Sequence, residues 1–213
     1  HRKGKATLYT CGPTVYDAAH IGNLRTYVFE DVLRRWLEYG HGYTVTQAMN
    51  ITDVEDKIIE ASKAKTVTDM QAFTKPYEDR FYADLEALGI ERAESYPKAT
   101  EHVAGMIALV EQIIANGFAY ERDGSVYFDV AKYRKHHDYG RLLKIDFAGF
   151  EHGHRIDNDE YDKESVQDFA LWKAVPKDSP GWESPWAHGR PGWHIECSEM
   201  SAEELGALPI DLH

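Results

Sequence analysis

Two cysteines carry the most reactive side chains of this sequence and could ligate a metal ion. Cys11 and Cys197 are its only cysteines, and no Cys-x-x-Cys pair is present. Thiolates are soft ligands that suit Zn²⁺, which usually takes four ligands in a tetrahedral arrangement. Two more ligands would be needed, and His194 and His213 are candidates, although the spacing singles out neither. The alternative interpretation is that both thiols are inert core residues.

A histidine at the expected start of a helix is the second candidate for chemistry. His20 opens the segment His20-Ile21-Gly22-Asn23, and the free backbone N–H groups of a helix N-terminus favour phosphate. Gly22 would let a ligand approach the backbone closely. The histidine could donate to a phosphoryl oxygen as negative charge builds there. A lone His-x-Gly pattern fits an ordinary histidine at a helix end equally well.

The apolar pattern predicts a strand, a helix and a second strand around these residues. Residues 6–10 form a short apolar run, and residues 43–51 alternate imperfectly as a second strand would. Residues 21–39 have helical spacing and are followed by a terminating glycine. The helix would pack through apolar residues that recur every three or four positions: Leu24, Tyr27, Val28, Val32, Leu33, Trp36 and Leu37. Strand, helix and strand imply a right-handed crossover and a parallel pair, the first unit of a nucleotide-binding sheet.

Capping residues predict three further helices in the first half of the chain. Thr52, Thr68 and Thr100 stand where N-caps are expected, and the helices would run to about residues 64, 88 and 116. Glu55 completes a capping box with Thr52. Pro76 lies inside the second of these helices and predicts a kink or a break near its middle.

The second half of the chain has a different texture. Arg122-Asp123-Gly124 lies between two short apolar runs, which is typical of a hairpin. Residues 131–168, including the histidine-rich stretch 136–154, are polar and suggest an inserted subdomain with a surface loop. Residues 193–197 look like a strand, and residues 202–205 like a short helix.

These patterns divide the chain into three parts. Residues 1–117 would be the first half of a Rossmann-like α/β domain with a parallel sheet. Residues 118–176 would be an inserted subdomain, and residues 177–213 the start of the domain's second half.

Composition limits the classes of protein to consider. The hydrophobic content of 43 % is ordinary for a soluble globular protein. The net charge of −12 argues against a protein that coats nucleic acid generically. No run of 18 apolar residues and no export signal is present, so we expect no membrane partner. Two distant cysteines without an export signal do not suggest a disulfide framework. We expect a cytoplasmic monomer.

Five segments together resemble the cysteinyl-tRNA synthetases, a family of class I aminoacyl-tRNA synthetases. In chain order they are Tyr9-Thr10-Cys11-Gly12-Pro13-Thr14-Val15-Tyr16-Asp17, His20-Ile21-Gly22-Asn23, Asn50-Ile51-Thr52-Asp53-Val54-Glu55-Asp56-Lys57-Ile58, Asp168-Phe169-Ala170-Leu171-Trp172-Lys173 and Gly189-Arg190-Pro191-Gly192-Trp193-His194-Ile195-Glu196-Cys197-Ser198. They cover nearly the whole chain in the family's order, and the last segment is the most specific.

The resemblance implies roles for matching positions. Cys11 and Cys197 look like two ligands of one Zn²⁺, and the other two, a histidine and a glutamate, are expected beyond residue 213. His20 and Asn23 look like the catalytic ends of the first ATP signature, although Asn23 replaces the generic final histidine. The implied ATP-binding residues are Pro13, Thr14, Tyr16, Asp17, His20, Ile21, Gly22 and Asn23. The implied cysteine pocket contains Gly12, Thr52, Trp193 and His213.

The implied reaction is activation of L-cysteine by ATP, with Mg²⁺, to cysteinyl adenylate, followed by transfer to tRNA(Cys). The second ATP signature and the domains that grip most of the tRNA are not in this sequence, so we expect the N-terminal catalytic part of a longer protein. Two alternatives stay open. One is a cysteine ligase of mycothiol biosynthesis, which forms the same adenylate, and the other is a non-catalytic module stabilised by zinc.

Overall fold

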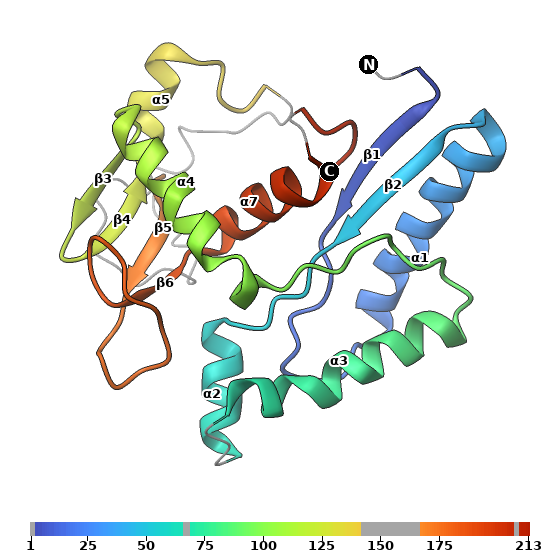
Figure 1. Ribbon diagram of the computed structural model, residues 1–213, viewed down its shortest axis with the longest axis horizontal. Helices are drawn as coiled ribbons and strands as arrows, with labels where there is room; N and C mark the ends of the chain where they lie inside the picture. Colours follow the sequence, from blue (N-terminus) through green and yellow to red (C-terminus); the bar gives the residue numbers. More distant parts are fainter. Residues whose placement is uncertain (1–2, 66–68, 142–166, 207–208) are drawn as a thin grey trace. The chain divides into compact units, whose positions relative to one another are not determined.

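The computed structural model describes residues 3–65, 69–141, 167–206 and 209–213 (Figure 1). Its internal contacts divide the chain into two compact units. The first comprises residues 1–102 and 197–213, and the second comprises residues 103–196. The three-part division expected from the sequence stays a prediction, because a unit defined by contacts is not a domain boundary. None of the helices in the described ranges is long and apolar enough to cross a membrane.

A parallel pair of strands forms the centre of the first unit. Strand β1 (Lys5–Thr10) pairs with strand β2 (Thr44–Met49), from Lys5 opposite Thr44 to Thr10 opposite Met49. Five of the six residues of β1 are buried, as expected for a strand with elements on both faces. Helix α1 (Ile21–Arg35) joins the two strands. The predicted parallel strand–helix–strand unit is therefore confirmed.

Isolated parallel bridges extend this pair on both sides. Ser95 and Lys98 lie beside β2, opposite Ala48 and Ile51, while Leu212 lies beside β1, opposite Leu8. The spatial order is thus residues 95–98, β2, β1 and residue 212. This is the order in which a doubly wound nucleotide-binding sheet begins, so the Rossmann-like α/β fold is confirmed.

Helix α1 departs from the prediction at its end and on its apolar face. The α-helix stops at Arg35, and Trp36–Gly40 continue as the π-helical turn η1. Tyr27 is buried with Phe81 and Leu85 of helix α3 (Met70–Ala87). Three other members of the predicted face are exposed, namely Val28, Val32 and Trp36. Periodicity correctly placed these residues on one helix, but it could not say which of them a neighbouring element covers.

Two of the predicted helix caps are wrong. Helix α2 (Asp56–Ala64) is capped by Glu55, whose side chain accepts from the N–H of Lys57. Thr52 pairs instead with Thr14 in a parallel bridge. Thr100 lies in the 3₁₀ turn η2 (Ala99–Glu101), and its hydroxyl donates to the Asp53 carboxylate at 2.6 Å. Each threonine is thus paired with a segment outside the helix that it was expected to cap.

The third cap cannot be compared directly, because Thr68 lies outside the described residues. Helix α3 is capped by Asp69, which accepts from the N–H groups of Gln71 and Ala72. Pro76 lies inside α3, and the helix continues through it, so of the predicted kink or break the break is wrong. A proline removes one backbone hydrogen bond, and the buried face around Phe73 and Phe81 outweighs that loss.

The second unit is an antiparallel sheet with helices. Its strands are β3 (Ala119–Arg122), β4 (Ser125–Phe128), β5 (Phe169–Ala174) and β6 (Gly189–Pro191), in that order. Helices α4 (Val103–Ala115) and α5 (Val130–His136) complete it. The hairpin β3–β4 is confirmed, with Asp123 and Gly124 in the left-handed region that its turn requires. Most of the expected polar loop, residues 142–166, lies outside the described residues.

Helix α7 (Trp193–Leu205) corrects the prediction for the end of the chain. The expected strand over 193–197 and the expected short helix over 202–205 are both parts of this one helix. A five-residue apolar run does not distinguish a strand from a helix. Residues 193–196 belong to the second unit, and the helix from Cys197 onward belongs to the first.

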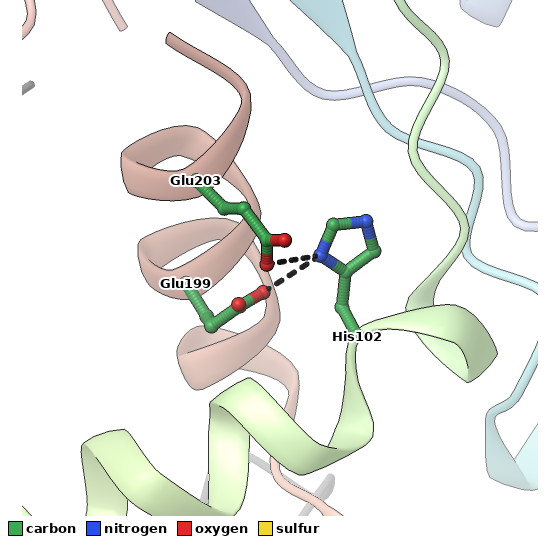
Figure 2. Close-up of side chains that lie close together, drawn as sticks. All are labelled: His102, Glu199 and Glu203. Atoms are coloured by element: carbon green, nitrogen blue, oxygen red, sulfur yellow. Dashed lines mark hydrogen bonds and ion pairs between the residues drawn. The ribbon is translucent and has the colours of Figure 1, made fainter. Parts of the chain in front are cut away.

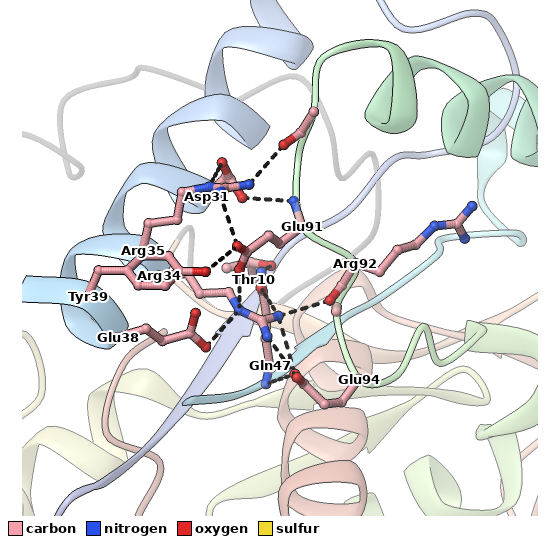
Figure 3. Close-up of polar contacts among 12 residues, drawn as sticks. Thr10, Asp31, Arg34, Arg35, Glu38, Tyr39, Gln47, Glu91, Arg92 and Glu94 are labelled. Atoms are coloured by element: carbon pink, nitrogen blue, oxygen red, sulfur yellow. Dashed lines mark hydrogen bonds and ion pairs between the residues drawn. The ribbon is translucent and has the colours of Figure 1, made fainter. Parts of the chain in front are cut away.

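One arginine ties the elements of the first unit together (Figure 3). Arg34 of α1 is buried and pairs with Glu94 at 2.8 Å and with Glu38 at 3.2 Å. It also donates to the side chain of Gln47 in β2 and to the carbonyl of Arg92. Helix α1, strand β2 and residues 91–94 therefore share one charged centre.

Arg34→Met should lower the free energy of unfolding by about 2–4 kcal/mol, because several carboxylates would lose their counter-charge in a half-buried site. Urea denaturation measures the change. Arg80→Met is the matched control. It removes an exposed pair with Asp84 and should cost less than about 0.5 kcal/mol. Equal losses in the two variants would contradict the central role of Arg34.

Candidate active site

The two cysteines lie together in the first unit. Cys11 directly follows β1, Cys197 lies on α7, and their Sγ atoms are 3.6 Å apart. This separation is longer than a disulfide bond of about 2.05 Å. Two sulfurs bound to one tetrahedral Zn²⁺ at about 2.3 Å each would lie about 3.8 Å apart. The pair therefore fits two ligands of one zinc ion without rearrangement of the backbone.

His213 lies against one of the two thiols, that of Cys11. Its side chain hydrogen-bonds to Cys11, and this contact raises the pKa of the His213 imidazole. The hydrogen bonds from Cys197 and then from His213 lower the pKa of Cys11 to about 5, against the opposing effect of burial. The edge of the His213 ring also packs on Tyr9, with the centroids 5.2 Å apart. The other histidine candidate, His194, packs on Phe169 in the second unit.

Gly12 and Thr52 are held by one asparagine that sequence reasoning did not single out. Asn50 follows β2 and is buried. Its side-chain oxygen accepts from the Gly12 N–H at 3.2 Å, and its side-chain nitrogen donates to the Thr52 hydroxyl at 3.2 Å. A Cβ atom on Gly12 would lie 1.9 Å from the Asn50 carbonyl oxygen, so only glycine fits there. The available sequence signal was an asparagine near the end of the strand predicted over residues 43–51.

The segment between Gly12 and His20 is anchored on Thr52 as well. The Pro13 carbonyl accepts from the Thr52 N–H at 3.0 Å, and the Val15 N–H donates to the Thr52 carbonyl at 3.1 Å. Thr14 lies between these two contacts, and the Tyr16 N–H donates to its carbonyl. Asp17 is exposed, and its carboxylate accepts from the N–H of Ala18. The implied ATP-binding loop and the implied cysteine pocket thus share a backbone anchor.

His20 caps α1 with its own ring. Its Nδ1 accepts from the N–H groups of Gly22 and Asn23, and the Asn23 side chain accepts from the His20 N–H. The Gly22 and Asn23 N–H groups, expected to be free for phosphate, are therefore engaged. Because Nδ1 accepts, the proton of the neutral ring lies on Nε2. A Cβ atom on Gly22 would lie 2.9 Å from the ring, so glycine makes room for this arrangement, and the neighbouring Ile21 is exposed.

Two further residues of α1 lie close enough to Cys11 to affect its electrostatics. Burial, followed by the charge of Cys11, raises the pKa of Glu30 to about 7. Burial, followed by the charges of Glu30 and Cys11, raises the pKa of Tyr27. The Glu30 Oε2 atom is buried without a hydrogen-bond partner among the described residues. Neither residue carries a local sequence signal, because their proximity to Cys11 depends on how α1 lies against β1.

Trp193 is the first residue of α7, four positions before Cys197, and about half of its surface is exposed. It belongs to the second unit. Of the residues expected at the cysteine pocket, the first unit thus contains Gly12, Thr52 and His213, and it brings His213 against Cys11.

Comparison with known proteins decides the family. A family model described as the catalytic domain of class I (C) tRNA synthetases matches residues 1–213. The chain belongs to this family. It is 49 % identical over 210 residues to a cysteine–tRNA ligase from Chlamydia pneumoniae, across 97 % of this chain and 43 % of that protein. It is 46 % identical over 216 residues to the cysteine–tRNA ligase from Methanosarcina mazei, across 100 % of this chain and 44 % of that protein.

This chain spans less than half the length of these curated relatives. Among solved structures it resembles methionyl-tRNA synthetase from Mycobacterium tuberculosis in complex with methionyl-adenylate. The TM-score is 0.67 at 15 % identity, over 97 % of this chain and 48 % of that chain. At this identity the likeness supports the fold alone. The fold is that of a class I synthetase catalytic domain.

Proposed function

We propose that the protein containing this chain activates L-cysteine with ATP to form cysteinyl adenylate and then transfers the cysteine to tRNA(Cys). The observation that carries the proposal is the convergence of Cys11 and Cys197 beside the carboxyl end of β1. Relatives that cover 97–100 % of the chain at 46–49 % identity carry the name cysteine–tRNA ligase, and this supports the choice of amino acid.

Cys11 and Cys197 are the proposed protein ligands of one Zn²⁺, completed by residues beyond 213. The donor chemistry and the 3.6 Å separation both fit this ion. When bound, zinc would ligate the substrate thiolate and bind the hydroxyl of serine much less well. A pocket without a metal discriminates poorly between two side chains that differ by one atom.

His20 is the proposed donor to the nucleotide. Its Nδ1 is occupied by the backbone of α1, so its Nε2–H is the group left to meet a phosphoryl oxygen. The helix holds the ring in place before the reaction, and such preorganised donors contribute most where charge develops in the transition state. Asn23 closes the cap by accepting from the His20 N–H and therefore acts through His20.

Thr52 and Gly12 are the proposed walls of the amino-acid pocket, joined by Asn50. Trp193 and His213 are proposed to complete it. The loop from Pro13 to Asp17 would follow the nucleotide, and Mg²⁺ is proposed to accompany ATP. We further propose that most of the tRNA is held by parts of the protein outside this acidic chain and that the enzyme is a cytoplasmic monomer.

Exchange of pyrophosphate into ATP, dependent on cysteine, tests the first step in the full-length protein. His20→Ala should lower the exchange rate by about 100-fold or more, with the Kd for cysteine changed less than about twofold, because the ring meets only the nucleotide. His20→Asn is the matched control for the cap. An asparagine can still cap α1 but cannot supply the Nε2–H, so stability should persist while exchange is lost.

Full exchange in the His20→Asn variant would assign His20 to the helix cap alone. Transfer of the activated cysteine to an amino sugar in place of tRNA would contradict the proposed acceptor. Absence of cysteine-dependent exchange in the full-length wild-type protein would favour a non-catalytic module stabilised by zinc.

Cys11→Ser and Cys197→Ser should each lower the zinc content of the full-length protein and weaken cysteine binding by about 10-fold or more. Elemental analysis and calorimetric titration measure the two effects. Ser201→Ala is the control, because Ser201 is buried on α7 one helical turn after Cys197 and its hydroxyl donates to the Ser198 carbonyl. Unchanged zinc stoichiometry and unchanged cysteine affinity in both serine variants would refute the zinc ligands.

A further inference from the structure

A second group of metal-ligating side chains lies in the first unit, outside the thiol pair (Figure 2). His102 follows the turn η2, and Glu199 and Glu203 lie one helical turn apart on α7. Residues separated by four positions share one face of a helix. Figure 2 shows both carboxylates directed at the same ring nitrogen of His102. Its Nδ1 atom is 3.1 Å from an oxygen of Glu199 and 3.1 Å from an oxygen of Glu203.

The charges in this group do not balance. Glu204 adds a third carboxylate, 3.8 Å from His102 Nε2. In the part of the chain that the structure describes, His102 is the one basic partner in the ion pairs of these three glutamates. A neutral imidazole has a single proton to share, and even a charged one offsets only one carboxylate. Three carboxylates therefore share one basic side chain, at a site where His102 and Glu199 are buried and Glu203 is exposed.

The geometry and the burial suit a bound cation. Two ligand atoms at about 2.0–2.1 Å from a tetrahedral ion lie about 3.3 Å apart, close to both nitrogen–oxygen distances. One ligand atom from each of the three residues lies within 4.8 Å of the others. The side chains of His102 and Glu199 are 9 % exposed, while that of Glu203 is 63 % exposed. The group thus has a fixed inner side and an open side through which an ion and its waters could enter.

We propose that His102, Glu199 and Glu203 form a second divalent-cation site, distinct from the thiol pair. One nitrogen and two carboxylate oxygens are a donor set for a borderline transition-metal ion such as Zn²⁺. The ion would fix α7 to His102, the residue that follows η2. Helix α7 also carries Cys197. Its role is structural, and it leaves the proposed chemistry at Cys11 and Cys197 unchanged.

Metal counting in the full-length protein tests this site. The wild-type protein, dialysed against Zn²⁺, should hold two equivalents, and the double variant Glu199→Gln/Glu203→Gln should hold one. The wild-type sequence changed only by Cys11→Ser and Cys197→Ser should retain one equivalent. Adding His102→Ala to that variant should weaken its zinc affinity at least 10-fold. Glu204→Gln is the control and should change binding less than twofold, because Glu204 lies 3.8 Å from the ring nitrogen that faces away from the site.

The Glu199→Gln/Glu203→Gln variant keeps both cysteines, so its zinc content reports on the second site even where the cysteine variants fail to fold. One zinc equivalent in the wild-type protein, or two in the Glu199→Gln/Glu203→Gln variant, would overturn the second site. Loss of all zinc in the Cys11→Ser/Cys197→Ser variant, with the wild-type zinc content kept in the Glu199→Gln/Glu203→Gln variant, would leave the proposed synthetase function standing and refute only this inference.

Discussion

The register of β1 against β2 is the constraint on which the candidate site depends. Because Thr10 lies opposite Met49, the next residues, Cys11 and Asn50, leave the sheet together at one edge. Asn50 then uses both ends of its amide, one for the Gly12 N–H and one for the Thr52 hydroxyl. A shift of one residue would reverse the faces of β1 and separate these groups. The position of the Cys11 thiol is thus fixed by backbone pairing rather than by its own contacts.

A buried polar network supports this edge from within the sheet. Gln47 of β2 donates to the Thr10 hydroxyl of β1, and its backbone N–H donates to Glu94. Arg34 joins Gln47 and Glu94 from α1 (Figure 3). A buried polar network of this kind rigidifies the structure when each of its polar groups has a hydrogen-bond partner. Helix α1, which begins at the His20 cap, is therefore fixed at its far end to the strands that position Cys11.

Local patterns in the sequence were sufficient for the alternation of strand and helix and for the parallel pair. They failed where a longer-range partner decides the outcome. The run from Trp193 to Cys197 is too short to separate strand from helix. Thr52 and Thr100 do not cap the expected helices, because Thr52 pairs with Thr14 and Thr100 bonds to Asp53. The meeting of Cys11 with Cys197 spans 186 positions. The two thiols were candidates for one metal ion from the sequence alone, but only the family resemblance favoured this over two inert core thiols. His102 has no local motif, because its partners lie nearly a hundred residues away.

The central claim is that the converging thiols hold a metal that recognises the substrate's sulfur. Cobalt substituted for zinc in the full-length protein reports this directly, since each bound thiolate adds charge-transfer absorption. Two protein thiolates should give a spectrum whose charge-transfer intensity rises by about half when cysteine binds, since a third thiolate joins the metal. Serine at the same concentration should leave it unchanged. No change with cysteine, or an equal change with serine, would contradict the account.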